Sequence, residues 1–198
     1  MNERQFDEIK TISFEQYFGE MELPEEEKER RIDLAKKFYD WFYEDYFLVY
    51  LADKSKDYVK AIYDAYLALS LEYLGMDKKP EYITDRASKI AHDIDKTTRE
   101  NDNEYYTSKD RAIIIAETET NVLGNYDMQI KAVKSGKHWK TWNTMRDDKV
   151  RQSHTLVDGK RIGIFEYFNV GGSKMLYPGD TSAPPEELIN CRCVLTYS

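Results

Sequence analysis

Two different hydrophobic periodicities divide this sequence of 198 residues, and together they limit it to folds that join helices to a small sheet. Up to about residue 135, apolar side chains recur at spacings of three and four, which is the period of an amphipathic helix. From Lys137 onward, the apolar runs are short and are separated by Gly, Pro, Asn and Asp, which is typical of strands joined by turns. The sequence therefore predicts an α+β protein with an N-terminal helical region, a long helix and a small antiparallel β-sheet.

Three helices are predicted in the first half. Pro24 and the acidic run after it suit the start of the first helix, because Pro fixes φ and negative charge is favoured at a helix N-terminus. Ser55 is a candidate N-cap for the second helix, and Gly75 is a candidate stop at its C-terminal end. A third apolar stripe follows, and the polar segment after it is interpreted as a domain boundary. We therefore expect a helical N-terminal region at residues 1–104 and an α+β domain at residues 105–198.

A fourth and longer helix is predicted from a cap at Thr107 or Ser108 to a stop at Gly136. Glu119 lies on its apolar face, where an unpaired carboxylate would be costly to bury. We therefore expect Glu119 to pair with a base. The candidate partners are Arg111, Arg151 and Arg192.

Turn signals organise the region after this helix. The segment 138–145 favours a strand, and residues 146–154 favour a turn with acidic groups that opens a short helix. Asp158-Gly159 between apolar runs then predicts a β-hairpin. Pro178-Gly179 predicts another turn, and the Pro-Pro-Glu-Glu sequence after it predicts a short helix. Residues 191–198 are predicted to form a terminal strand.

The two cysteines, Cys191 and Cys193, are separated by one residue and would share one face of a strand. They could bind zinc with His154 as the third ligand and Asp158 or another His as the fourth. They could instead supply a nucleophile, with His154 as the base and Asp158 or Asn190 as its orienting group. In a third interpretation, both thiols are small hydrophobic core residues, and a disulfide between them would close a strained small ring. The third interpretation is the expected one, so no cofactor is predicted, with zinc as the alternative.

The net charge of −8 is unevenly distributed. Residues 1–104 carry a net charge of −10, whereas residues 131–161 hold nine basic and three acidic side chains. The acidic first half argues against a general nucleic-acid binder, but the basic segment could contact phosphate or an acidic protein. The predicted binding surface consists of Lys131, Lys134, Lys137 and Lys140.

Several functional classes lack their sequence signals. The apolar run at residues 47–52 is far short of a membrane span, and the charged N-terminus contains no signal-peptide segment. Neither the Walker spacing nor the HExxH or GxSxG motifs of common hydrolases occur. We therefore expect a cytosolic protein that does not enter a membrane.

Four separated motifs occur in a recognisable order over about residues 107–198: RAIIIAETETN, KTWNTMRDDKVRQSHTLVDGKRI, LYPGD and INCRC. This set resembles the phage Mu F-like family of minor head proteins, the head-morphogenesis proteins of tailed phages. The sequence departs from the family pattern at Glu117, where the family usually has Arg. The matching positions include Thr118, Glu119, Trp142, Asp147, Asp148, Arg151, His154, Asp158, Gly159, Asn190, Cys191, Arg192 and Cys193.

The resemblance implies a structural role in the virion of a tailed phage or prophage. Such proteins enter the procapsid, bind the portal protein and other capsid proteins, and influence DNA packaging or ejection; some bind DNA. The resemblance implies location in the host cytoplasm during assembly and then inside the head, and it suggests no enzymatic activity. The alternatives are a metal-binding or Cys/His-dependent enzyme domain acting on capsid or host targets, and a cellular interaction module.

Overall fold

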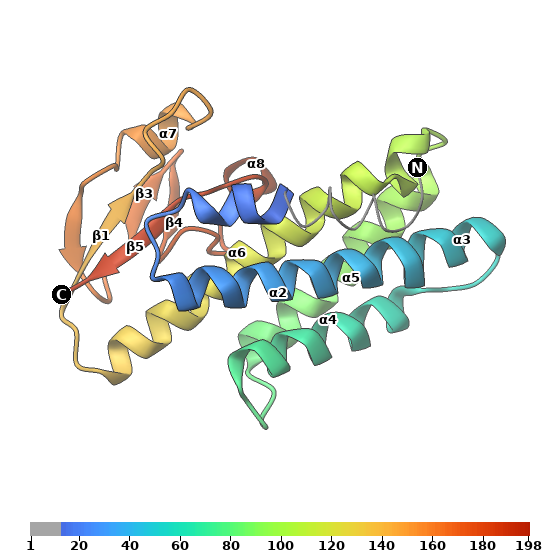
Figure 1. Ribbon diagram of the computed structural model, residues 1–198, viewed down its shortest axis with the longest axis horizontal. Coiled ribbons are helices and arrows are strands. Elements are labelled where there is room, and N and C mark those ends of the chain that lie inside the picture. The colour runs from blue at the N-terminus through green and yellow to red at the C-terminus, as the bar shows by residue number, and fades with distance from the viewer. Residues whose placement is uncertain (1–12) are drawn as a thin grey trace. The chain divides into compact units, whose positions relative to one another are not determined.

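The computed structural model describes residues 13–198 and has the predicted α+β architecture, with two compact units (Figure 1). Unit 1 combines the described residues up to Ile32 with Glu117–Ser198, and unit 2 is Asp33–Ala116. This division differs from the predicted boundary after residue 104. The polar segment around that position lies inside unit 2, and residues 13–32 belong with the C-terminal residues because buried side chains join them. Two helices, α2 (Glu25–Asp40) and α6 (Lys109–Lys134), contribute residues to both units.

Unit 2 is helical and has an aromatic core. Fully buried rings of Phe38, Phe42 and Tyr66 pack against one another, as the period of the apolar stripes predicts. Its elements are the end of α2, a π-helical segment Trp41–Phe47, α3 (Leu48–Ala52), α4 (Val59–Leu74), α5 (Glu81–Glu100), a 3₁₀ turn Glu104–Thr107 and the start of α6.

Helix boundaries in unit 2 follow local signals, with one exception. Gly75 ends α4 in the left-handed conformation with φ of 60°, as predicted. The hydroxyl of Ser108 accepts a hydrogen bond from the amide of Arg111 at 3.2 Å, which confirms the cap of α6. The prediction that Ser55 caps α4 is wrong, because α4 begins at Val59 and the carboxylate of Asp57 accepts the Val59 amide at 2.9 Å.

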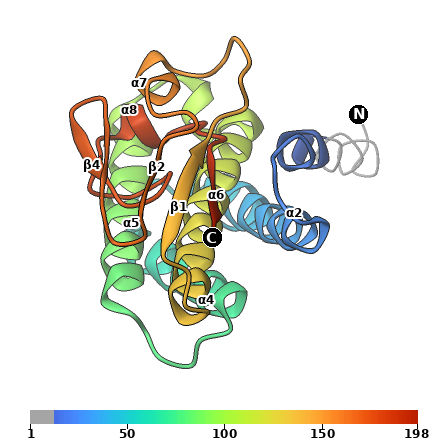
Figure 2. The same ribbon diagram turned by 90° about the vertical axis from the view of Figure 1, so that its left-hand side faces the viewer.

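Unit 1 contains an antiparallel three-stranded sheet in the order β2-β1-β5, with β1 in the centre. A separate hairpin is formed by β3 and β4. Figure 2 shows β1 running beside the C-terminal half of α6. In this half of α6, the side-chain amide of Gln129 donates to the backbone carbonyl of Ile164 at 3.0 Å. The strands are β1 (Trp139–Asn143), β2 (Arg161–Gly163), β3 (Phe168–Val170), β4 (Ser173–Met175) and β5 (Val194–Tyr197).

The predicted Asp158-Gly159 hairpin is not the direct connection between two strands. A short helix, α7 (Gln152–Thr155), lies between β1 and this turn, and Gly159 has φ of 71°. The amide of Gly159 donates to the carbonyl of Trp142 at 2.8 Å, so the turn returns the chain to β1. The turn therefore still aligns β2 with β1, although it follows a helix rather than a strand.

The other C-terminal predictions hold more closely. Gly179 has φ of 86° in the predicted turn, and α8 (Pro185–Leu188) begins with proline. The terminal strand starts at Val194 and not at residue 191, because Asn190 takes a left-handed conformation with φ of 57° and the segment after it is not paired.

Polar side chains occupy much of the interior of unit 1. The fully buried guanidinium of Arg31 donates to the carboxylate of Glu27 at 2.9 Å and to the side-chain oxygen of Asn121 at 2.5 Å. A Cβ atom at Gly124 would collide with this guanidinium, so the glycine in the middle of α6 makes room for it. These contacts attach residues 13–32 to the C-terminal part of unit 1.

No helix within residues 13–198 combines the length and the apolar character needed to cross a membrane.

Candidate functional site

His154, Cys191 and Cys193 meet in the interior of unit 1, as the zinc and the nucleophile interpretations both require. The Nδ1 atom of His154 lies 3.3 Å from Sγ of Cys193 and 3.6 Å from Sγ of Cys191. The donor atoms of all three residues lie within 4.8 Å of one another, and each residue is at most 3% exposed. The cysteines are free thiols. The chain therefore brings two thiols and an imidazole together out of contact with bulk water.

The second nitrogen of the His154 ring is held by an acid that the sequence did not single out. Nε2 lies 2.8 Å from the carboxylate of Glu187 in α8, and the same oxygen accepts the hydroxyl hydrogen bond of Ser153 at 2.8 Å. Gly171 lies directly against this carboxylate, where a Cβ atom would collide with it. This arrangement fixes the imidazole ring with Nδ1 facing the two sulfurs.

Side chains of α6 hold the backbone of the two cysteines. The amide group of Asn121 donates to the carbonyl of Cys191 at 2.6 Å, and that of Asn125 donates to the carbonyl of Cys193 at 3.1 Å. The hydroxyl of Tyr17 donates to the same Cys191 carbonyl at 3.2 Å. The cysteine segment is thus positioned by buried hydrogen bonds rather than by strand pairing.

Trp142 closes the cluster on another side. Its ring is fully buried and meets the ring of His154 edge-to-face, with centroids 5.6 Å apart. The indole Nε1 makes no hydrogen bond of ordinary length within residues 13–198. Cys191 and burial raise the pKa of the Cys193 thiol, and Trp142 partly opposes them.

The two thiols do not ionise independently. The Cys193 thiol lowers the pKa of Cys191 by hydrogen bonding to it, and His154 lowers it further although burial opposes the shift. The same hydrogen bond, together with burial, raises the pKa of Cys193. Burial opposes the positive charge of His154, but Cys191 and Glu187 outweigh it and raise the imidazole pKa. The cluster therefore favours one thiolate beside a protonated imidazole when it holds no metal.

A small pocket adjoins the cluster. His154, Cys191 and Cys193 line it together with Lys149, Arg151 and Arg192. The centre of a water molecule could occupy a volume of about 10 Å³ in this pocket, which is close to the minimum needed to hold one water.

The other acidic and basic motif residues have different partners, and among them Arg192 and Asp147 bond to each other. Asp147 and Glu20 accept hydrogen bonds from the guanidinium of Arg192, and Arg151 donates to the carbonyl of Ile189.

Asp148 is exposed, whereas Asp158 accepts hydrogen bonds from the Thr144 backbone amide at 2.8 Å and the Arg146 guanidinium at 2.9 Å. Asp158 therefore supports the turn before β2, and neither it nor Asn190 is the group that orients His154. The backbone N–H of Asn190 donates to the hydroxyl of Thr118 at 3.3 Å.

Glu119 is buried, as its position on the helix predicts. Its pairing with Arg111, Arg151 or Arg192 stays a prediction, and the described hydrogen bonds of these three guanidinium groups go to other residues. Arg192 instead acts on the neighbouring acid Glu117, where its charge partly offsets the burial that raises the carboxyl pKa to about 7.

Three of the four predicted surface lysines are exposed, and Lys140 is not. Its side chain is fully buried and donates to the carbonyl of Leu176 at 2.7 Å, and burial lowers its pKa to about 8. The prediction that Lys140 belongs to a binding surface is therefore wrong. Lys131 forms an ion pair with Asp127 at 2.6 Å, and Lys134 and Lys137 lie in the exposed end of α6 and the turn after it.

Sequence reasoning missed Glu187, Asn121 and Asn125. The two asparagines are four residues apart on a helix, so they share one face, and this polar pair on a long apolar helix was the available signal. No local pattern distinguished Glu187 from the other acids of its short helix.

Comparison with known proteins identifies the C-terminal half. The family model described as "Phage Mu protein F like protein" matches residues 85–196. An "Uncharacterized protein" of Haemophilus influenzae (strain ATCC 51907 / DSM 11121 / KW20 / Rd) is 34% identical over 88 residues, which are 44% of this chain and 17% of that relative. The chain thus corresponds to a small part of that longer protein. No solved structure matches the chain. Because the family model covers more than half of the sequence and includes the whole Cys–His cluster, the chain belongs to the phage Mu protein F-like family, which connects it to phage head morphogenesis.

Proposed function

We propose that this chain is a minor head protein of a tailed phage or prophage, a non-enzymatic assembly factor that binds the portal and assists DNA packaging or ejection. The observation that carries the proposal is the family match over residues 85–196. In this role the chain acts in the host cytoplasm during assembly and is then enclosed in the head. Its partners are the portal protein and other capsid proteins, with DNA as a further candidate.

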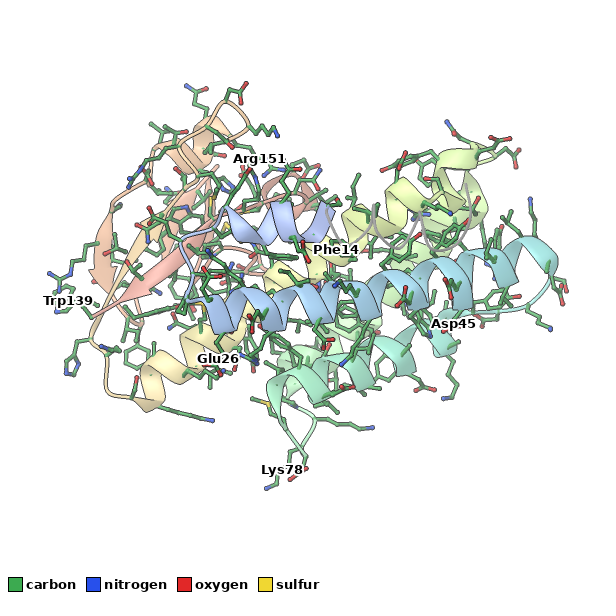
Figure 3. The ribbon with its side chains drawn as sticks, in the orientation of Figure 1. Phe14, Glu26, Asp45, Lys78, Trp139 and Arg151 are labelled. Carbon is green, nitrogen blue, oxygen red and sulfur yellow. The ribbon has the colours of Figure 1, made fainter. Side chains whose placement is uncertain are left out.

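A surface of unit 1 suits such a contact. We define the basic–aromatic surface as Lys134, Lys137, Trp139, Arg161 and Phe165. The side chains of Trp139 and Phe165 are 47% and 71% exposed, and the Arg161 guanidinium lies 4.9 Å from the Trp139 ring centroid. Figure 3 labels Trp139 at the start of β1, where its side chain points away from the strands.

Strand pairing brings Trp139, Arg161 and Phe165 together from distant positions. Trp139 is opposite Gly163 in the sheet, and the amide of Ile164 donates to the carbonyl of His138 at 2.9 Å, so Phe165 follows directly. Exposed aromatic rings beside positive charges are typical of sites that bind acidic protein surfaces or nucleic acid. This surface retains the predicted Lys134 and Lys137 and replaces the buried Lys140.

The test is binding of the purified chain to the portal protein of the same phage or prophage. The Lys134→Glu/Lys137→Glu variant should bind about tenfold more weakly, since each reversed rim charge costs about 0.5–1 kcal/mol. The matched control is Lys78→Glu/Lys79→Glu, which makes the same charge change at exposed positions between α4 and α5 (Figure 3).

Failure of the wild-type chain to bind any portal or capsid protein would contradict the assembly role. Equal binding by wild type and the Lys134→Glu/Lys137→Glu variant would reject the basic–aromatic surface. A parallel titration with duplex DNA, repeated at two salt concentrations, would identify DNA as the partner if affinity falls steeply with salt.

Thiol-dependent catalysis is a second candidate function, favoured by one observation. His154 faces the sulfurs with one ring nitrogen and an acid with the other, which is the relation between nucleophile, base and orienting group in Cys–His enzymes. Burial of both thiols argues against it, because a substrate could not reach them in this conformation. Slow labelling of the folded chain by iodoacetamide is expected, and rapid labelling of one cysteine would instead support the enzyme.

A further inference from the structure

We propose that His154, Cys191 and Cys193 bind one zinc ion, with a solvent molecule from the adjoining pocket as the fourth ligand. This inference concerns the interior of unit 1 and does not depend on the proposed portal-binding role. The sequence left a zinc site open as one alternative. The structure adds the ligand atoms, the residues that support them and the open coordination position.

The distances between donor atoms fit a tetrahedral zinc. Zinc–sulfur bonds of about 2.3 Å and zinc–nitrogen bonds of about 2.0–2.1 Å place a sulfur and a nitrogen ligand about 3.5 Å apart at the tetrahedral angle. The two corresponding distances to Nδ1 of His154 are 3.3 Å for Cys193 and 3.6 Å for Cys191. The ion can therefore enter between the three donors with little change in the backbone.

The outer contacts of the cluster are those of a metal-binding histidine. A zinc-bound imidazole usually donates its remaining N–H to a carboxylate or carbonyl, which fixes the ring and its tautomer. Nε2 of His154 has this contact with Glu187 at 2.8 Å, and Glu187 is itself held by Ser153. With Nε2 protonated, Nδ1 is the free ligand atom, and it is the nitrogen that faces the sulfurs.

The indole of Trp142 gives an independent reason to expect thiolates. Its N–H is fully buried and has no hydrogen-bond partner within residues 13–198, and its ring packs against His154. A buried donor without an acceptor is costly, whereas a metal-bound thiolate accepts N–H hydrogen bonds well. Two thiolates would also neutralise a divalent ion, which removes the cost of burying either charge alone.

The donor set selects the metal class. Thiolate and imidazole ligands in tetrahedral geometry favour zinc over magnesium or calcium, which prefer oxygen ligands. The neighbouring pocket has space for about one water molecule and is bordered by Lys149, Arg151 and Arg192. These cations make the open position suitable for water or hydroxide and unsuitable for a second metal ion.

The experiment is metal analysis of the full chain after refolding with zinc and removal of the excess. About one zinc per chain is expected in the wild type, with loss of most of it in Cys193→Ser and in His154→Ala. His138→Ala is the matched control, because His138 is exposed and lies outside the cluster, and it should retain the metal. Replacement of zinc by Co²⁺ should give the sulfur-to-cobalt charge-transfer band and the intense visible bands of a tetrahedral thiolate site.

A separate variant tests the geometry without removing a ligand. Glu187→Gln keeps the size of the side chain but not its charge, and should weaken zinc binding about 10- to 100-fold in competition with a coloured chelator. This measurement remains decisive if the cysteine variants fail to fold.

The proposal is overturned if the refolded wild type binds no zinc and shows no cobalt–thiolate band. It is equally overturned if zinc is retained in both Cys193→Ser and His154→Ala, since the metal would then lie elsewhere. Portal binding that persists after zinc removal would not contradict the zinc site. The zinc proposal and the portal-binding proposal can therefore fail independently of each other.

Discussion

Substitution of Glu117 by glutamine should stabilise the protein at alkaline pH and leave its stability nearly unchanged at acid pH. Burial raises the pKa of this carboxyl from 4.5 to about 7, and the charge of Arg192 and a hydrogen bond from Ser13 only partly oppose the shift. The folded state therefore binds the Glu117 proton more tightly than the unfolded state. The stabilisation that results is complete below pH 4.5 and is lost as pH rises through 7.

The expected size follows from the two pKa values. A rise from 4.5 to about 7 corresponds to about 3 kcal/mol of unfolding free energy at 1.36 kcal/mol per pKa unit. Glutamine resembles the protonated acid and does not titrate. The difference in unfolding free energy between Glu117→Gln and wild type should thus grow by about 3 kcal/mol between pH 4 and pH 8.

Urea denaturation followed by tryptophan fluorescence measures this difference. A Trp41→Phe background removes the tryptophan of unit 2 and leaves Trp139 and Trp142 to report on unit 1. Glu22→Gln, at an exposed acid of the same unit, is the control for general charge effects. A difference that stays constant from pH 4 to pH 8 would refute the reasoning, because it would mean that Glu117 is as well solvated in the folded state as in the unfolded one.

Two further predictions concern buried groups of unit 1. Burial lowers the pKa of Lys140 from 10.5 to about 8. The unfolding free energy of wild type should therefore rise by up to about 3 kcal/mol relative to that of Lys140→Met between pH 8 and pH 10.5, as measured by urea denaturation at several pH values. The same rise relative to Lys137→Met would contradict the prediction. Gly124→Ala should displace the guanidinium of Arg31 and lower the unfolding free energy by about 3 kcal/mol or more, measured by thermal unfolding. Gly19→Ala, at an open helical position, is the matched control, and a similar small effect at both glycines would show that the space at Gly124 is not needed.

Elements with strong local signals could be predicted from the sequence. Gly75 ends its helix because glycine tolerates the left-handed conformation, and α8 starts at Pro185 because the first helical residue needs no amide donor. The grouping of His154 with the cysteines belonged to the two alternative interpretations and not to the expected one, which treated both thiols as hydrophobic core residues. These features depend on a few neighbouring residues or on scarce residue types.

Other features depend on contacts between distant segments, and the sequence did not reveal them. The two-unit division arises from Arg31 and Tyr17, whose partners lie about ninety or more residues away. The burial of Lys140 was signalled only by its alternation with Trp142, which places both on the inner face of β1. Glu187 was missed because only the folded position of α8 distinguishes it from neighbouring acids.

The discontinuous make-up of unit 1 has a consequence for biosynthesis. Residues 33–116 emerge from the ribosome as a continuous stretch and can collapse on their own contacts. The segment that contains Tyr17 and Arg31 must instead wait until α6 and the unpaired segment around Cys191 have been made. Joining them closes a long loop of chain, which costs conformational entropy. Helical order in residues 33–116 is therefore expected to precede the attachment of residues 13–32, and a stalled nascent chain that ends before Cys191 should leave residues 13–32 open to protease.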